Sequence, residues 1–197
     1  MATTTTQLTT ALEAINTLLA TIGQAPVSSL DTPGLVDAVT AKKTLNEVTR
    51  ATLANDWHFN TDYNYPIAPD TDGHIVLPSN VLKIDTTREF HTYDVVRRGS
   101  KLWDKHRHTF AFDKTLKFNV TWLLDFEEIP EEARYYITIR ASRIFQDRVF
   151  SSDTLHGYTQ YDEDIAWANL MRLENEIADP NILDAPGTNT IAYRRGY

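Results

Sequence analysis

Residues 14–31 read AINTLLATIGQAPVSSLD, a helical pattern that stops abruptly at a glycine. The apolar residues of this first segment recur at spacings of four and three: Leu8, Leu12, Ile15, Leu19 and Ile22. This spacing predicts an amphipathic helix whose N-terminus the neighbouring threonines can cap. Gly23 supplies the left-handed residue that ends a helix, and Pro26 keeps the following chain from rejoining it.

Two more segments repeat this helical period. The second helix ends near Asn55, and its predicted inner face consists of Ala38, Ala41, Leu45, Val48 and Thr52. The third helix starts at Pro130, and the charges of Glu131 and Glu132 complement the positive end of its dipole. Its predicted inner face consists of Ala133, Ile137, Ala141, Ile144 and Phe145.

A fourth helix is predicted from roughly Tyr158 to Ile177, because Ala166, Leu170 and Leu173 recur at helical spacing. Three acidic residues fall in its predicted first turn, where the dipole again favours them: Asp162, Glu163 and Asp164. Clustered carboxylates of this kind are explained by helix starts and need no general acid–base role.

Between residues 60 and 125 the helical period vanishes and short β-type runs appear. VVRRGSKLWD (95–104) predicts a hairpin about a tight turn at Arg98, Gly99 and Ser100. In KFNVTW (117–122), apolar and polar residues alternate, which predicts a half-buried antiparallel strand.

The order of these segments predicts an α+β fold. Four short amphipathic helices each need an apolar partner, so the two terminal pairs (1–59 and 126–178) are expected to form one bundle. An antiparallel β lobe (60–125) is inserted between the pairs. Residues 179–197 lack any period and are broken by Pro and Gly, which predicts a flexible C-terminal tail.

The composition restricts the functional classes. The 197 residues carry a net charge of −8, which argues against a protein that binds nucleic acid through its phosphate groups. Cysteine is absent, which excludes a thiolate nucleophile and Cys-ligated zinc. No apolar run is long enough to span a bilayer, and the start MATTTTQLTT does not resemble a signal peptide.

The enzyme alternative rests on one motif, DKHRHTF (104–110). On a strand, His106 and His108 would share one face and, with Asp104, offer ligands for a metal-dependent hydrolase. Lys105 and Arg107 lie within the cluster and favour a solvated hairpin tip instead. No phosphate-binding glycine loop, GxSxG elbow or HExxH pair occurs, so we expect no enzyme, cofactor or metal. A DNA-packaging accessory is the other alternative, and steeply salt-dependent DNA binding would identify it.

Four stretches carry a family resemblance, in this order: ALEAINTLLATIGQAPVSSLD, AKKTLNEVTRATLANDWHFN, IPEEARYYITIRASRIFQDRVF and YDEDIAWANLMRLENE. Together they resemble the tail tubular protein A family, the head-to-tail adaptors of short-tailed bacteriophages. The most specific pieces are the IGxxPV turn after the first helix and WxFN after the second. A neck or completion protein of a longer-tailed phage is the nearest structural alternative.

The resemblance implies a structural protein of the virion tail, assembled in the host cytoplasm without a membrane. Adaptors of this family form a dodecameric ring beneath the portal protein and extend the channel used for DNA ejection. They present a surface to the tail nozzle protein, and tail fibres attach around that junction. Genomic DNA is expected to pass through the channel without specific binding, which agrees with the net negative charge of the chain.

Two sets of residues are candidates for contacts in such an assembly. Aromatic and arginine side chains at helix ends are expected to form the subunit interface, since both types are enriched at interfaces: Trp57, Phe59, Arg140, Arg143 and Phe145. For the arginines, ion pairing within the helix is the alternative. In the tail, apolar and basic residues are expected to dock on the portal or a neighbouring subunit, or to fold back on their own bundle: Ile182, Leu183, Arg194 and Arg195.

Overall fold

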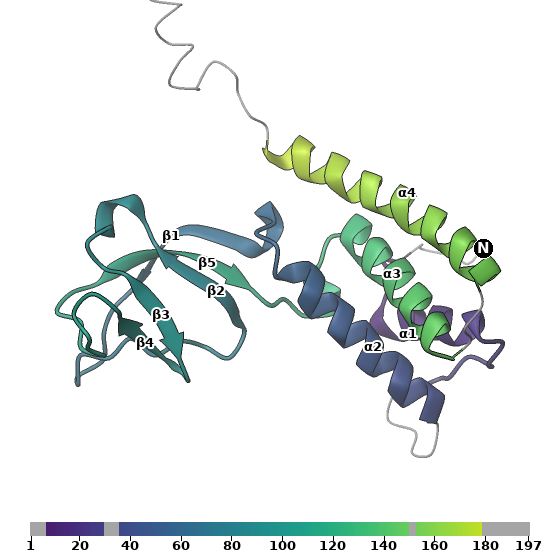
Figure 1. Cartoon of the computed structure of the whole chain (residues 1–197), viewed down its shortest axis with the longest axis horizontal. Coiled ribbons are helices and arrows are strands. Elements are labelled where there is room, and N and C mark those ends of the chain that lie inside the picture. The colour runs from purple at the N-terminus through teal and green to yellow at the C-terminus, as the bar shows by residue number, and fades with distance from the viewer. Residues whose placement is uncertain (1–6, 30–35, 150–152, 179–197) are drawn as a thin grey trace, which may run out of the picture.

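The computed structural model describes residues 7–29, 36–149 and 153–178. Helices gather at one end of an elongated molecule and strands at the other (Figure 1). The helices are α1 (Ala11–Thr21), α2 (Val36–Leu53), α3 (Glu131–Val149) and α4 (Asp153–Ala178). The strands are β1 (Thr61–Ile67), β2 (Val81–Thr86), β3 (Val95–Arg98), β4 (Lys101–Asp104) and β5 (Leu116–Trp122). The predicted α+β class is confirmed.

Local sequence signals set both ends of α1. Thr10 caps its N-terminus through a reciprocal pair of hydrogen bonds with Glu13, whose pKa these bonds lower. The helix therefore starts after Leu8, which is 56% exposed, so the prediction that Leu8 belongs to the apolar face of this helix is wrong. Gly23 adopts a φ of +73°, the left-handed conformation predicted for the helix stop.

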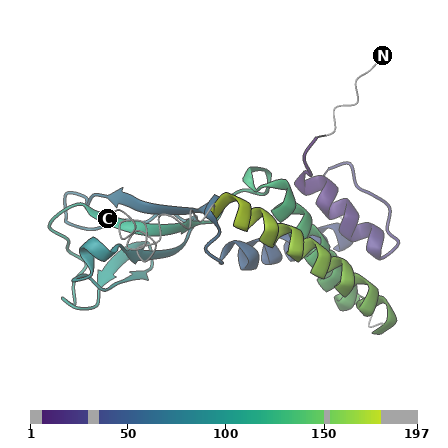
Figure 2. The same ribbon diagram turned by 90° about the horizontal axis from the view of Figure 1, so that it is seen from above.

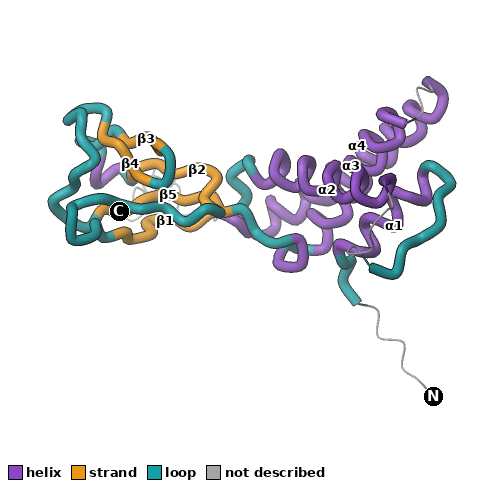
Figure 3. Tube along the Cα trace, turned by 90° about the horizontal axis from the view of Figure 1, so that it is seen from below, coloured by secondary structure: helices purple, strands orange, loops and turns teal. Residues whose placement is uncertain are grey.

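Helix α3 is the centre of the helical end, because it packs against α1, α2 and α4. Its buried residues come from all sides of the helix: Ala133, Arg134, Tyr136, Ile137, Thr138, Ala141, Ser142, Phe145 and Gln146. Figure 2 shows α4 lying across the upper side of α3, and Figure 3, seen from below, separates the purple helical end from the orange strands. One apolar core joins the four helices.

The predicted start of α4 is wrong. The helix begins at Asp153 and continues through Gly157, so Asp162, Glu163 and Asp164 lie well inside it rather than in its first turn. A glycine in a helix interior costs only about 1 kcal/mol relative to alanine, which packing against α3 readily offsets. The helix dipole therefore does not explain these three carboxylates.

The strands form a second core. β5 lies between β1 and β2 in an antiparallel sheet, and β3 and β4 form the predicted hairpin. Gly99 has a φ of +64° in the two-residue turn of this hairpin, as its tight geometry requires. The apolar residues that fill this core include Ile75, Leu77, Leu102, Phe112, Leu116, Phe118 and Val120.

The alternation predicted for β5 fails at its last residues. Phe118 and Val120 are fully buried, but Thr121 is also buried although it belongs to the polar set. The pairing of β2 with β5 shifts by one residue between Val81 and Lys83, which locally turns the strand. Thr121 then donates to Asp56 at 2.7 Å.

Candidate interaction surfaces

An aromatic cluster joins the end of α2 to α4. Trp57 is 4% exposed and donates through Nε1 to the carbonyl of Thr52 at 2.7 Å. Its ring stacks on Phe59 at 6.1 Å and meets the edge of Trp167 at 5.7 Å. Trp167 in turn contacts the ring of Tyr136 on α3. The predicted interface residue Trp57 is therefore packed within its own subunit, and Phe59 is half-buried beside it.

Arg140 and Arg143 meet a carboxylate of α4. Glu163 accepts a hydrogen bond from Nε of Arg143 and lies 3.8 Å from Nη1 of Arg140. The bond to Glu163 is the main reason that the pKa of Arg143 is raised. Asp147 lies 3.4 Å from the same guanidinium, so the ion pair within the helix also forms. Two arginines and Glu163 thus fasten α4 to α3 inside one chain.

Phe145 is completely buried in the helical core. It has no exposed surface in the single chain, unlike the half-buried Phe59 and Arg140. Arg140 and Arg143 thus face α4, whereas Phe145 lies within the core, so the structure does not bring the five predicted interface residues together on one surface. The tail residues Ile182, Leu183, Arg194 and Arg195 lie outside the described residues.

The sequence interpretation missed Arg134, a buried charge in the first turn of α3. Only 5% of its surface is exposed. Its guanidinium donates to the carbonyls of Ile129 at 2.6 Å, of Thr9 at 2.8 Å and of Glu127. A cation in the first turn opposes the helix dipole, and this mismatch is the signal that the sequence offered. Arg134 ties the start of α1 to the start of α3.

The histidine motif forms an exposed turn and not a strand. Residues 105–108 lie in turns, and His108 has a φ of +53°. Asp104 is fully buried and accepts hydrogen bonds from the backbone N–H groups of His106 at 2.8 Å and Arg107 at 3.2 Å. His106 and His108 therefore do not share a strand face, and the interpretation of this motif as a solvated hairpin tip is confirmed.

Among the described residues, only Asp70, Asp72 and His74 bring three potential metal ligands together. Oδ1 of Asp70 accepts backbone hydrogen bonds from both of the others, and the one from His74 is the main cause of the lowered pKa of Asp70. Nδ1 of His74 lies 2.9 Å from the ammonium group of Lys101. A tight turn and a nearby cation account for this cluster.

The role of Asp104 can be separated from that of the histidines by mutation. Asp104→Ala should lower the free energy of unfolding by about 1–3 kcal/mol, because two backbone donors lose their acceptor. His106→Ala should change it by less than about 0.5 kcal/mol, since the side chain is exposed. Urea denaturation of both variants measures the difference. Equal losses would contradict the assignment.

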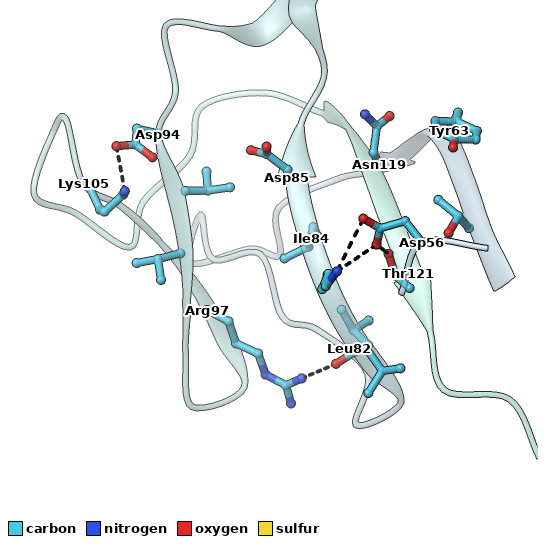
Figure 4. A pocket seen from close by; sticks show the side chains of 15 residues that line it. Asp56, Tyr63, Leu82, Ile84, Asp85, Asp94, Arg97, Lys105, Asn119 and Thr121 are labelled. Carbon is cyan, nitrogen blue, oxygen red and sulfur yellow. Dashed lines mark hydrogen bonds and ion pairs between the residues drawn. The ribbon is translucent and has the colours of Figure 1, made fainter. Parts of the chain in front are cut away.

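A groove of about 690 Å³ runs over the β lobe between β2 and β3 (Figure 4). The charged groups drawn there are largely paired: Lys83 lies 3.3 Å from Asp56, and Lys105 lies 2.8 Å from Asp94. Arg97 donates to the carbonyl of Val81 at 2.6 Å. Three carboxylates and three cations line the groove, so its formal charges balance.

A family model described as Tail tubular protein matches residues 12–180, which span both lobes. The chain belongs to the tail tubular protein family. It is therefore a structural protein of a phage tail, and the resemblance predicted from the four helical stretches is confirmed.

One relative of this tail tubular protein is Tail tubular protein A of Klebsiella phage KP34. The two chains are 29% identical over 126 residues, which are 64% of this chain and 66% of the relative. The match thus spans just under two thirds of the relative. Within the described part of the tail tubular protein, none of the helices has the length and apolar character needed to cross a membrane.

The two sequence pieces most specific to the resemblance lie at joints of the fold. In the IGxxPV turn, the side chain of Asn16 makes two hydrogen bonds with the backbone of Val27. Its NH2 group donates to the carbonyl at 3.0 Å, and its Oδ1 accepts from the N–H group at 2.8 Å. In WxFN, the side-chain NH2 of Asn60 donates to the carbonyls of Leu53 at 2.7 Å and Trp122 at 3.0 Å. Asn60 therefore links the end of α2 to the last strand of the sheet.

Proposed function

We propose that the chain is a head-to-tail adaptor. Twelve copies form a ring between the portal protein and the tail nozzle protein, extend the DNA channel and support tail-fibre attachment. The observation that carries this proposal is the family match across both lobes.

The shape and charge of the molecule support this role. The helical end and the β lobe have separate cores. One end can therefore contact neighbouring subunits while the other meets the next tail component. The net charge of −8 suits a channel that genomic DNA passes without binding.

The five residues predicted for the subunit interface are proposed to act in two ways. Phe59 and Arg140 keep exposed area at the joint of α2 and α4 and can touch a neighbour directly. Trp57, Arg143 and Phe145 lie mostly within the subunit and act indirectly. Trp57 and Arg143 hold α4 in place against α3, and Phe145 stabilises the helical core.

The tail is proposed to dock on the portal or on a neighbouring subunit, with Ile182 and Leu183 as anchors and Arg194 and Arg195 near acidic groups. Deleting 181–197 should leave the melting temperature within about 1 °C, because a segment that docks on a partner makes its contacts outside its own subunit. Binding to purified portal should fall at least about tenfold, as measured by pull-down at several concentrations. A lower melting temperature with unchanged portal binding would instead support folding back on the bundle.

The adaptor role is tested by removing the gene from the phage and supplying the chain in trans. Without the chain, infected cells should accumulate DNA-filled heads that lack nozzle and fibres. Supplying the full-length chain should restore tailed, infectious particles. Tails that assemble normally in its absence would contradict the proposal.

A further inference from the structure

The outer faces of α2 and α4 point away from each other. Helix α3 packs against both of these helices and lies between them (Figure 1). The side of α2 that carries Leu45 and Val48, and the side of α4 that carries Ala166 and Leu170, are buried in the common core. Each helix therefore leaves its opposite side uncovered, on two different sides of the subunit.

The uncovered face of α4 is apolar and acidic. Tyr161 is 68% exposed and Ile165 is 45% exposed, one helical turn apart, and Ala168 continues this row. Asp162 and Asp164 are exposed beside them. Among the described residues, no basic group lies within ion-pair distance of either aspartate, although Glu163 between them is paired with Arg143.

The uncovered face of α2 is apolar and basic. Val36 is 76% exposed and Val39 is 61% exposed, and Lys43 and Arg50 follow on the same side at helical spacing. This stretch has two acidic groups, Asp37 and Glu47. Asp37 is half-buried in the first turn of α2, and Glu47 is already bound by both Nη atoms of Arg148 at 3.0 Å. Within the described part of the chain, Lys43 and Arg50 lack an ion pair.

We propose that the α2 face of one copy docks on the α4 face of the next copy. The two valines then cover Tyr161 and Ile165, and Lys43, one turn beyond Val39, meets the aspartates of α4. Arg50, about two turns further along α2, adds positive charge at the edge of the contact. The complementarity lies within one sequence, which identifies the occupant of each face as a second copy of this chain. Because the contact joins two different faces, it repeats head to tail and generates a closed ring or a filament.

This inference rests on the proposed ring and names the faces that build it. It also gives a reason for the acidic residues within α4 that the helix dipole does not explain: Glu163 holds α4 on its own α3, whereas Asp162 and Asp164 face outward. In this proposal Glu163 stabilises the folded subunit, whereas Asp162 and Asp164 act only in assembly.

Charge reversal tests the contact in the full-length chain. The double variant Lys43→Glu/Arg50→Glu should weaken self-assembly at least about tenfold, as should Asp162→Lys/Asp164→Lys, because each places like charges on both faces. The quadruple variant restores opposite charges and should recover assembly. Arg88→Glu/Arg98→Glu, on exposed β-lobe positions, is the matched control and should assemble normally. Sedimentation velocity measures assembly, and circular dichroism confirms that each variant is folded.

Chemical cross-linking tests the same contact without changing any charged residue. The chain has no native cysteine, so Val39→Cys/Ile165→Cys places one thiol on each proposed face. A short bis-maleimide should yield a ladder of covalent multimers, whereas Val39→Cys/Tyr63→Cys should not.

The outcomes distinguish this inference from the proposed function. Normal assembly of both charge-reversed variants, or failure of the quadruple variant to recover, would overturn the α2–α4 contact while leaving the adaptor role intact. A wild-type chain that never self-associates, even with the portal present, would overturn both.

Discussion

Replacing Phe145 by alanine should lower the free energy of unfolding by about 3–5 kcal/mol. The ring is fully enclosed by the helical core, so its removal forfeits apolar burial and leaves a cavity. Guanidinium denaturation, followed by circular dichroism, measures the loss. The expected phenotype is an unstable subunit rather than a folded subunit that fails to form rings.

Tyr135→Ala is the matched control for Phe145. Tyr135 lies on the same helix but is 47% exposed, so its truncation should cost less than about 1 kcal/mol. A Phe145 variant that keeps normal stability yet does not assemble would show that this ring acts at the interface instead.

Replacing Arg134 by methionine should cost about 3 kcal/mol or more. The variant keeps the volume of the side-chain stem but leaves three carbonyl groups without the guanidinium that now binds them. Thr9 would lose one of its ties to α3, which frees the chain ahead of α1. Thermal unfolding measures the loss of stability, and hydrogen exchange at α1 measures its local release.

Lysine and a surface arginine provide the controls for Arg134. Arg134→Lys should rescue little of the stability, because one ammonium group cannot reproduce the planar fork of the guanidinium. Arg172→Ala removes an exposed pair with Glu176 and should cost less than about 0.5 kcal/mol. Equal effects of Arg134→Met and Arg172→Ala would contradict the role given to Arg134.

Features determined by neighbouring residues could be predicted from the sequence. The helix stop at Gly23 and the hairpin turn at Gly99 depend on local backbone geometry, and the sequence predicts both. A threonine cap is also predicted, but ahead of Leu8, whereas the structure places it at Thr10. The helical period correctly identified the inner face of α2, because burial there follows the spacing of apolar residues. In α3 it identified only part of the buried surface, because this helix packs against three others and buries polar residues as well.

Features determined by distant contacts could not be predicted. The early start of α4 depends on packing against α3, which overrides the weak helix propensity of Gly157. The targets of Arg134 lie on the preceding turn and at Thr9, far away in sequence. The interface candidates were chosen by residue type, which does not distinguish a ring buried in its own core, such as Phe145, from one on the surface.

Cryo-electron microscopy of the purified protein bound to its portal reports both the number of subunits and their position, and so tests the adaptor role and the α2–α4 contact together. We expect a closed ring of twelve copies between portal and nozzle, with α2 of each subunit against α4 of its neighbour. A bound monomer, an open filament, or density located away from the portal–nozzle junction would contradict it.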